Sequence, residues 1–107
     1  MSGPTTVRIG GGGGFYGDRL SAPINLIKQG NLDYIIIDYL AELTMSILAK
    51  QRSRDRHAGW ATDLLEWLTD GGMLALKNHK TCLVTNAGGA NPRSCAEAVT
   101  AIAAELG

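Results

Sequence analysis

The sequence predicts an α/β fold in which helices flank a small parallel sheet of three strands. Three short apolar runs, at residues 7–9, 34–37 and 82–84, each end in a polar segment that is rich in glycine or acidic residues. Strands that alternate with helices favour a parallel sheet with right-handed crossovers. The carboxyl ends of parallel strands share one edge, where such folds bind ligands. We therefore expect a Rossmann-like half, or the N-terminal fragment of a larger α/β domain, with a crevice at that edge.

Composition limits the size and the partners of the protein. Residues 1–107, of which 45% are hydrophobic, are enough for one small core and hence one domain. Ten basic residues balance ten acidic ones, which argues against nucleic acid or an anionic membrane as partner. The first residues lack a signal-peptide pattern and no apolar run is long enough to span a membrane, so we expect a cytoplasmic protein.

The first half of the chain predicts two strands and two helices. Residues 5–9 form a β-branched strand that stops at five glycines, and these are expected to form a loop. The next helix has Ser21 as its N-cap and Gly30 as its stop. Residues 32–37 are almost continuously apolar, as in a central strand covered by helices on both faces. An amphipathic helix follows, and we interpret its basic tail at residues 50–56 as a solvated helix end.

The second half predicts a short helix, a strand and a long helix. The short helix ends at Gly71 and Gly72, although a second apolar element extends or follows it, and residues 80–85 form the third strand. Asn91 and Pro92 then supply an N-cap and a first-turn proline for the last helix. Trp60 and Trp67 are expected in the core or at an interface.

The two cysteines match no common zinc or redox spacing. We expect Cys82 and Cys95 to be reduced thiols that behave as small buried hydrophobic residues. The alternative is a reactive Cys95, because the first turn of a helix lowers the pKa of a thiol.

The glycine run is the first candidate ligand-binding segment. The backbone N–H groups of Gly11, Gly12, Gly13 and Gly14 would hold a phosphate or a carboxylate between a strand and a helix. Five adjacent glycines match Gly-x-Gly-x-x-Gly almost automatically, so a structural turn is the alternative. No lysine follows the glycines, which excludes a Walker-type loop.

Acidic residues at the first two strand exits are the candidate catalytic groups. Asp18, Asp38 and Glu42 face the expected crevice, where carboxylates perform acid–base chemistry or hold a divalent cation. For Asp38 the alternative is a helix cap. His57 and His79 lie outside the three exits and are expected at the surface, and no metal-binding motif is present.

The third strand exit is the most specific candidate. Asn86 and Asn91 offer amide groups, Gly88 and Gly89 allow close backbone approach, and Arg93 provides a planar cationic fork for an anion. The alternative is an asparagine-rich turn that only caps the last helix.

Three blocks together resemble a known family. They lie at residues 8–18, 32–42 and 84–92, and they are similar in content and order to the N-terminal part of the acyclic terpene utilisation (AtuA-type) proteins. The resemblance implies a chain that is shorter than its family members, and a role in the catabolism of branched acyclic acids as coenzyme A thioesters. It implies no catalytic residue.

These observations lead to three hypotheses about function. The first is a ligand-binding α/β module of terpene or branched acyl-CoA catabolism, whose glycine-rich and Asn/Gly/Arg loops bind a small anionic ligand. That ligand is a coenzyme A thioester or a nucleotide, because both present phosphates. The second is a lyase or hydratase subunit with a carboxylate base, completed by a partner chain. The third is a non-catalytic assembly subunit. A homo-oligomer or a C-terminal partner segment is expected, because a three-stranded sheet exposes its edge.

Overall fold

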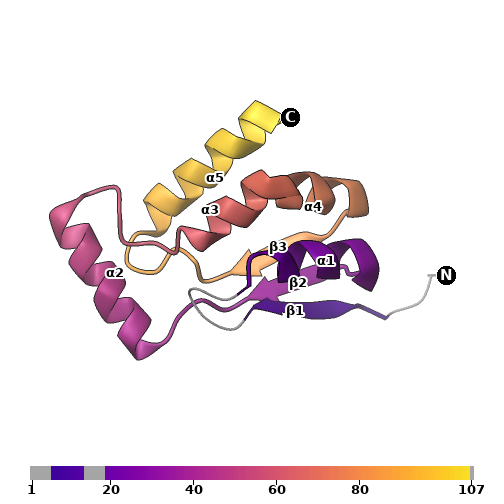
Figure 1. Ribbon diagram of the computed structural model, residues 1–107, viewed down its shortest axis with the longest axis horizontal. Helices are drawn as coiled ribbons and strands as arrows, with labels where there is room; N and C mark the ends of the chain where they lie inside the picture. The colour runs from indigo at the N-terminus through magenta and orange to yellow at the C-terminus, as the bar shows by residue number, and fades with distance from the viewer. Residues whose placement is uncertain (1–5, 14–18, 107) are drawn as a thin grey trace.

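The computed structural model describes residues 6–13 and 19–106 and has the expected α/β architecture (Figure 1). Three parallel strands form one sheet, and helices pack against it. The elements in chain order are β1 (Ile9–Gly13), α1 (Ser21–Gly30), β2 (Tyr34–Ile37), α2 (Glu42–Arg54), α3 (Asp63–Trp67), η1 (Leu68–Gly72), α4 (Met73–His79), β3 (Cys82–Thr85) and α5 (Pro92–Leu106).

The strand order in the sheet is β1-β2-β3, so β2 is the central strand, as predicted. Pairing is parallel on both sides of β2, and an irregularity at Gly12 shifts the register near the end of β1. Four rows of paired residues cross all three strands. Two of them contain the exposed residues of β2: Ile9, Tyr34 and Cys82 form one row, and Gly11, Ile36 and Val84 form the other.

The glycines of β1 are strand residues, so the prediction that they form a loop after a strand at residues 5–9 is wrong. A Cβ atom on Gly10 would lie 2.6 Å from Leu32 Cδ1, and one on Gly12 would lie 2.8 Å from Ile35 Cδ1. Both distances are too short for real side chains. The two glycines therefore allow apolar side chains of the core to pack directly over the backbone of β1.

All helices that pack on the sheet lie on one of its sides. Helix α1 contacts β1 and β2 and also α3, η1 and α4, so these helices form one layer. Along β2 the buried Ile35 and Ile37 alternate with Tyr34 and Ile36, which are 42% and 43% exposed. The prediction of helices on both faces is wrong for the described residues, because none of the helices in residues 19–106 covers the other face, which we call the bare face.

The core lies between the covered side of the sheet and this helix layer. Trp67 is 1% exposed, and its indole Nε1 donates a hydrogen bond of 2.9 Å to the hydroxyl oxygen of the buried Tyr39. Trp60 is also buried, and its Nε1 donates to the carbonyl of His57 at 2.8 Å. Both tryptophans are thus core residues with satisfied polar atoms, in agreement with the sequence prediction.

The sequence predicted that the short helix ends at Gly71 and Gly72, but in the structure the helix continues through a kink into α4. Gly71 has a φ angle of 105°, which favours glycine, and the chain then resumes helical geometry at Met73. Gly72 packs against the ring and the carbonyl oxygen of Trp67, where a Cβ atom would overlap both. The predicted second apolar element is therefore α4.

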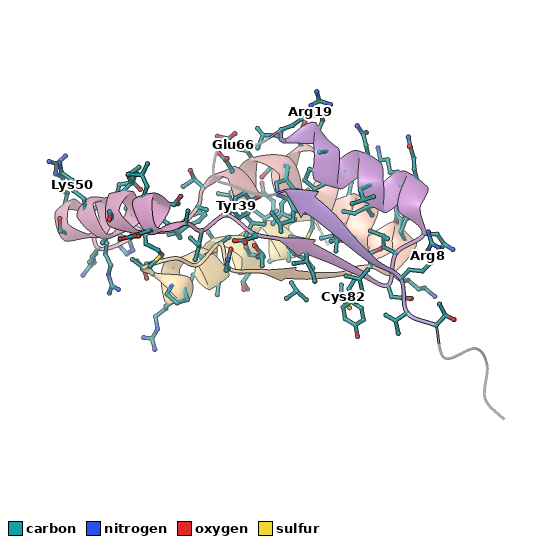
Figure 2. All side chains as sticks on the ribbon, turned by 90° about the horizontal axis from the view of Figure 1, so that it is seen from below. Arg8, Arg19, Tyr39, Lys50, Glu66 and Cys82 are labelled. Atoms are coloured by element: carbon teal, nitrogen blue, oxygen red, sulfur yellow. The ribbon has the colours of Figure 1, made fainter. Side chains whose placement is uncertain are left out.

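Helix α2 projects from the body of the protein (Figure 1), and Lys50 lies on its far part (Figure 2). Its only buried residue is Leu48, whereas Leu43 is 73% exposed. The helix is therefore not the amphipathic helix that the sequence predicted, because it buries no apolar face.

Three smaller predictions are also corrected. Ser21 is the first residue of α1 rather than its cap; the N-cap is Leu20 and makes no side-chain capping bond. The third strand begins at Cys82, not at residue 80. Cys82 is exposed and lies on the side of the sheet away from α1 (Figure 2), whereas Cys95 is buried as expected.

The start of α5 at Pro92 confirms the predicted boundary. Asn91 Oδ1 accepts a hydrogen bond of 3.3 Å from the backbone N–H of Ser94, which is N-cap geometry. Within residues 6–13 and 19–106, no helix combines the length and the apolar content needed to cross a bilayer.

The glycines of β1 allow a test of this packing. Gly12→Val places extra methyl groups against Ile35 and Ile37 and should lower the free energy of unfolding by ~1–3 kcal/mol. Gly11→Val is the matched control, because nothing lies within 4 Å of a Cβ atom there and valine suits a strand. Urea denaturation measures both. Equal losses in the two variants would contradict the packing described here.

Candidate functional site

The loops that follow β2 and β3 are joined at the carboxyl edge of the sheet. The side-chain amide of Asn86 donates from Nδ2 to Asp38 Oδ1 at 2.8 Å. The Oδ1 atom of Asn86 accepts a bond of 2.9 Å from the backbone N–H of Tyr39. Asp38 Oδ1 also accepts from the backbone N–H of Leu40 at 3.0 Å. The fold therefore brings the predicted residues Asp38 and Asn86 into direct contact.

These hydrogen bonds determine the chemistry of Asp38. The bond from Asn86, and secondarily the bond from the Leu40 N–H, lower the pKa of the fully exposed Asp38 carboxyl. A carboxylate with a lowered pKa is a weaker base, so this geometry favours holding a ligand over abstracting a proton. Asp38 does not cap α2, because the N-cap of α2 is Ala41. Glu42 is the first residue of α2 and is exposed to solvent.

A hollow of about 330 Å³ adjoins this contact on the bare side of the sheet. The apolar part of its lining comes from β2 and β3, and the polar part comes from the ends of these strands and the residues that follow them. The lining residues are Ile36, Ile37, Asp38, Val84, Thr85 and Asn86. We call it the edge hollow.

A second recess lies between the C-terminal end of α2 and the start of α5. It has a volume of about 590 Å³, and three arginines and one histidine line it against a single carboxylate. We call it the cationic groove, and its lining residues are Arg52, Arg56, His57, Asn91, Pro92, Arg93, Ser94 and Glu97.

The arginines of the cationic groove differ in how they are held. Arg52 Nη1 donates to the carbonyl oxygen of Ala90 at 2.7 Å, which ties α2 to the loop before α5. Arg56 Nε donates to Nε2 of His57 at 3.3 Å, so this ring nitrogen acts as an acceptor. Among the described residues, the side chain of Arg93 has no hydrogen-bond or ion-pair partner, so its guanidinium is available to a ligand.

The other predicted residues of the third exit shape the groove through packing and hydrogen bonds, and of these Asn91 also lines it. Asn91 is buried, and its Nδ2 donates to the carbonyl oxygens of Arg56 and Ala58 at 2.9 Å each. Gly89 has a φ angle of 52°, and a Cβ atom there would lie 2.6 Å from Leu48 Cδ1. Its neighbour Gly88 packs in the same way against Pro92. These contacts hold α2 close to the loop.

The sequence predicted one crevice, whereas the predicted site residues line two separate recesses. Asp38 and Asn86 line the edge hollow, and Arg93 lines the cationic groove. Of the predicted glycines, Gly11, Gly12 and Gly13 belong to β1, and neither Gly14 nor Asp18 is among the described residues.

Sequence reasoning missed Arg52, Arg56 and His57 as groove residues. The signal was the basic run at residues 50–56, which was interpreted as a solvated helix end. Only the fold shows that this run ends beside Arg93.

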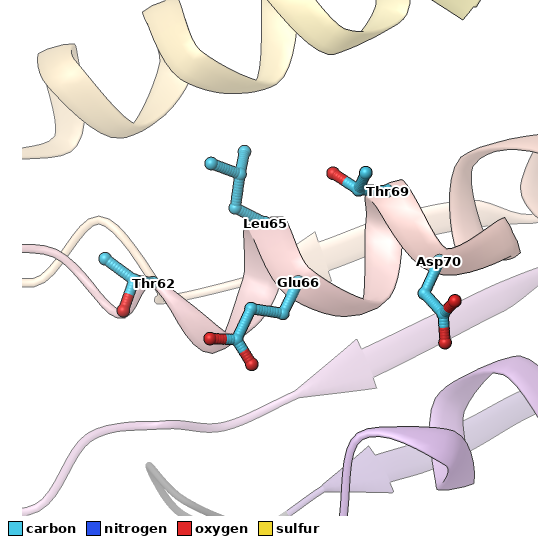
Figure 3. A pocket seen from close by; sticks show the side chains of 5 residues that line it. All are labelled: Thr62, Leu65, Glu66, Thr69 and Asp70. Carbon is cyan, nitrogen blue, oxygen red and sulfur yellow. The ribbon is translucent and has the colours of Figure 1, made fainter.

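A third hollow, of about 510 Å³, runs along α3 and η1 (Figure 3). Glu66 and Asp70 line it together with Thr62, Leu65 and Thr69, and no lysine, arginine or histidine is among its lining residues. Two carboxylates without a basic partner repel an anion, so this hollow does not suit the ligand class that the sequence predicted.

The Cys95 thiol and the possibility of a metal site are the remaining candidates for a reactive centre. Burial raises the pKa of the Cys95 thiol, which makes it less reactive and contradicts the alternative of a lowered pKa at the helix start. Within the part of the chain that the structure describes, no three histidine, cysteine, aspartate or glutamate side chains gather as a metal site.

The contact between Asp38 and Asn86 predicts a change in titration. Asn86→Ala removes the larger cause of the lowered pKa, so the pKa of Asp38 should rise toward its ordinary value. In the wild type, the stabilisation from these bonds is present above the ordinary aspartate pKa of about 3.9 and is lost as the pH falls through the lowered pKa. Carboxyl NMR titration measures the shift, with the exposed Asn78→Ala as control. An unchanged pKa in Asn86→Ala would rule out the contact.

Comparison with known proteins gives one finding. No curated protein and no solved structure matches the chain. Residues 7–107 match the sequence model described as "Acyclic terpene utilisation family protein AtuA". This match covers nearly the whole chain and agrees with the resemblance of its three sequence blocks. The protein therefore belongs to the acyclic terpene utilisation family AtuA.

Proposed function

We propose that this protein binds an anionic metabolite of terpene utilisation and that the cationic groove holds its phosphate groups. The observation that carries the proposal is the gathering of Arg52, Arg56 and Arg93 around one recess that contains a single carboxylate, Glu97. Like charges repel, so three guanidinium groups at one recess favour an anionic occupant. Family membership supplies the context of terpene utilisation.

The chemistry of the groove suits phosphate in particular. A guanidinium group presents a planar set of donors that matches two oxygens of a phosphate. Arg93 lies in the first turn of the 15-residue helix α5, where the positive end of the helix dipole adds to the attraction. The chain has no net charge, so the attraction for an anion comes from local clusters of basic residues such as this groove.

The groove has a suitable size for part of a larger ligand. Its volume of about 590 Å³ lies within the range of ~300–1,000 Å³ of small-molecule sites. A coenzyme A thioester of a branched acid is the ligand we expect in this pathway, with its phosphates in the groove. A nucleotide presents the same phosphate chemistry, and the experiment below separates the two.

The edge hollow supports ligand binding better than catalysis. Asp38 has a lowered pKa and is already hydrogen-bonded to Asn86, so it would orient a polar group of a ligand. The lyase or hydratase hypothesis needs a strong base, and this environment does not favour one.

The proposal predicts the effect of substitutions in the groove. Arg93→Ala and Arg56→Ala should each weaken binding of coenzyme A by about tenfold or more, because a charge-assisted hydrogen bond contributes ~1.5–3 kcal/mol. Isothermal titration calorimetry with coenzyme A, a coenzyme A thioester of a branched acid, ATP and inorganic phosphate measures the affinities. Binding should also weaken with added salt.

Lys50→Ala is the matched control, because Lys50 lies on α2 but does not line the groove. It removes one positive charge and should leave the affinity within about twofold. If Lys50→Ala and Arg93→Ala weaken binding equally, the attraction is general rather than local. If the folded wild type binds none of the four compounds, the proposal is wrong.

A further inference from the structure

Glu97 is the one carboxylate among the residues that line the cationic groove, and it lies on the same helix as Arg93. The two residues are four positions apart on α5, so their side chains leave one face of the helix, with Cβ atoms ~5–6 Å apart. Among the described residues, neither side chain has a hydrogen-bond or ion-pair partner. An arginine that precedes a glutamate by four residues pairs less well than the reverse order. A cation and an anion, both available to a ligand, therefore lie side by side at the groove.

Arg93 is the guanidinium of the groove that is best able to hold a phosphate. Arg52 and Arg56 each already donate one hydrogen bond within the protein, of 2.7 Å and 3.3 Å. The side chain of Arg93 has all of its donors available, and it lies in the first turn of α5. A phosphate bound to Arg93 therefore brings its neighbouring atoms against Glu97.

Glu97 determines which atoms can lie next to that phosphate. A second phosphate in this position would be repelled, because like charges repel at short range. A hydroxyl group would instead donate a charge-assisted hydrogen bond to the carboxylate. Acidic side chains hold ribose hydroxyls in this way in dinucleotide-binding folds. The pair of Arg93 and Glu97 thus matches a phosphate and a hydroxyl on neighbouring carbon atoms.

We propose that Glu97 is a specificity-determining residue that selects a ribose carrying a phosphate and a hydroxyl on neighbouring carbons, as at the 3′-phosphate end of coenzyme A. The 3′-phosphate would bind Arg93, and the 2′-hydroxyl would donate to Glu97. This inference rests on the proposed function of the cationic groove and names the part of the ligand that lies against these two residues.

The chemistry of the pair separates coenzyme A from ATP. All phosphates of ATP are attached at the 5′ carbon, so its ribose hydroxyls have no phosphate beside them. NADP does present the pair, with a 2′-phosphate beside a 3′-hydroxyl. Of the two sources, coenzyme A is the one expected in terpene utilisation, and NADP is included in the experiment to compare them.

The first test asks whether Arg93 holds the ribose phosphate. Coenzyme A, dephospho-coenzyme A and NADP are titrated by calorimetry into the wild type and Arg93→Ala. The wild type should bind coenzyme A about tenfold or more tightly than dephospho-coenzyme A, which lacks the 3′-phosphate. Arg93→Ala should remove this difference, because dephospho-coenzyme A has no group for Arg93 to hold. NADP should bind more weakly than coenzyme A.

The second test concerns the hydroxyl. Adenosine 3′,5′-bisphosphate and its 2′-deoxy analogue differ only in this group, and the wild type should prefer the first by about fivefold or more. Glu97→Ala should bind both alike and should bind inorganic phosphate more tightly than the wild type, since a repulsion is removed. Glu97→Gln should keep part of the preference, because its amide oxygen still accepts a hydrogen bond.

Glu105→Ala is the matched control for Glu97→Ala. It removes one negative charge from the same helix, and Glu105 is exposed and does not line the groove. This variant should discriminate between the two bisphosphates as the wild type does.

Two results would overturn the inference while leaving the proposed function standing. The first is Arg93-dependent binding of coenzyme A with equal affinity for dephospho-coenzyme A, because the diphosphate would then occupy the groove. The second is a preference for the ribose form that persists in Glu97→Ala. If the folded wild type binds none of these compounds, the proposed function and the inference are both wrong.

Discussion

The constraint on which the rest of the structure depends is the order of the strands. They lie in the sheet in the order in which they occur in the chain, and parallel connections are right-handed. Each crossover therefore places its helix on the same side of the sheet, where α1 meets α3, η1 and α4. Among the described residues, the core forms on that side. The helix layer and the bare face are two results of one topology.

The same topology separates the polar residues into two recesses. The link between Asp38 and Asn86 holds the loops after β2 and β3 together at the sheet edge. Helix α2 then leaves the body of the protein, and its C-terminal end returns beside the start of α5 because Gly89 allows Leu48 to pack closely against the loop. The arginines of α2 thus meet Arg93 at a recess away from the sheet, and the cationic groove depends on how α2 is placed.

The distribution of charge and apolar surface connects these features to function. A chain with no net charge has an arginine-lined groove at one place and an uncharged apolar sheet face at another. The groove is the place proposed for an anionic ligand. In that proposal the described structure acts by binding rather than by chemistry, which agrees with the lowered pKa of Asp38 and the buried, less reactive thiol of Cys95.

The sequence by itself determined the fold class, the parallel sheet with β2 at its centre and the start of α5. It also placed Asp38 and Asn86 at one edge of the sheet, although only the structure shows the hydrogen bond between them. These follow from local patterns, such as apolar runs, the Asn-Pro cap and the shared edge of parallel strands. Only the tertiary structure decided that the glycines of β1 belong to the strand, because the reason is close packing against Leu32 and Ile35. It also decided that helices cover β2 on one face, because an unbroken apolar run in the sequence does not determine whether one or both faces of the strand are buried. The cationic groove needed the fold as well, because its arginines come from segments that are distant in the chain and meet only when α2 and α5 are placed in space.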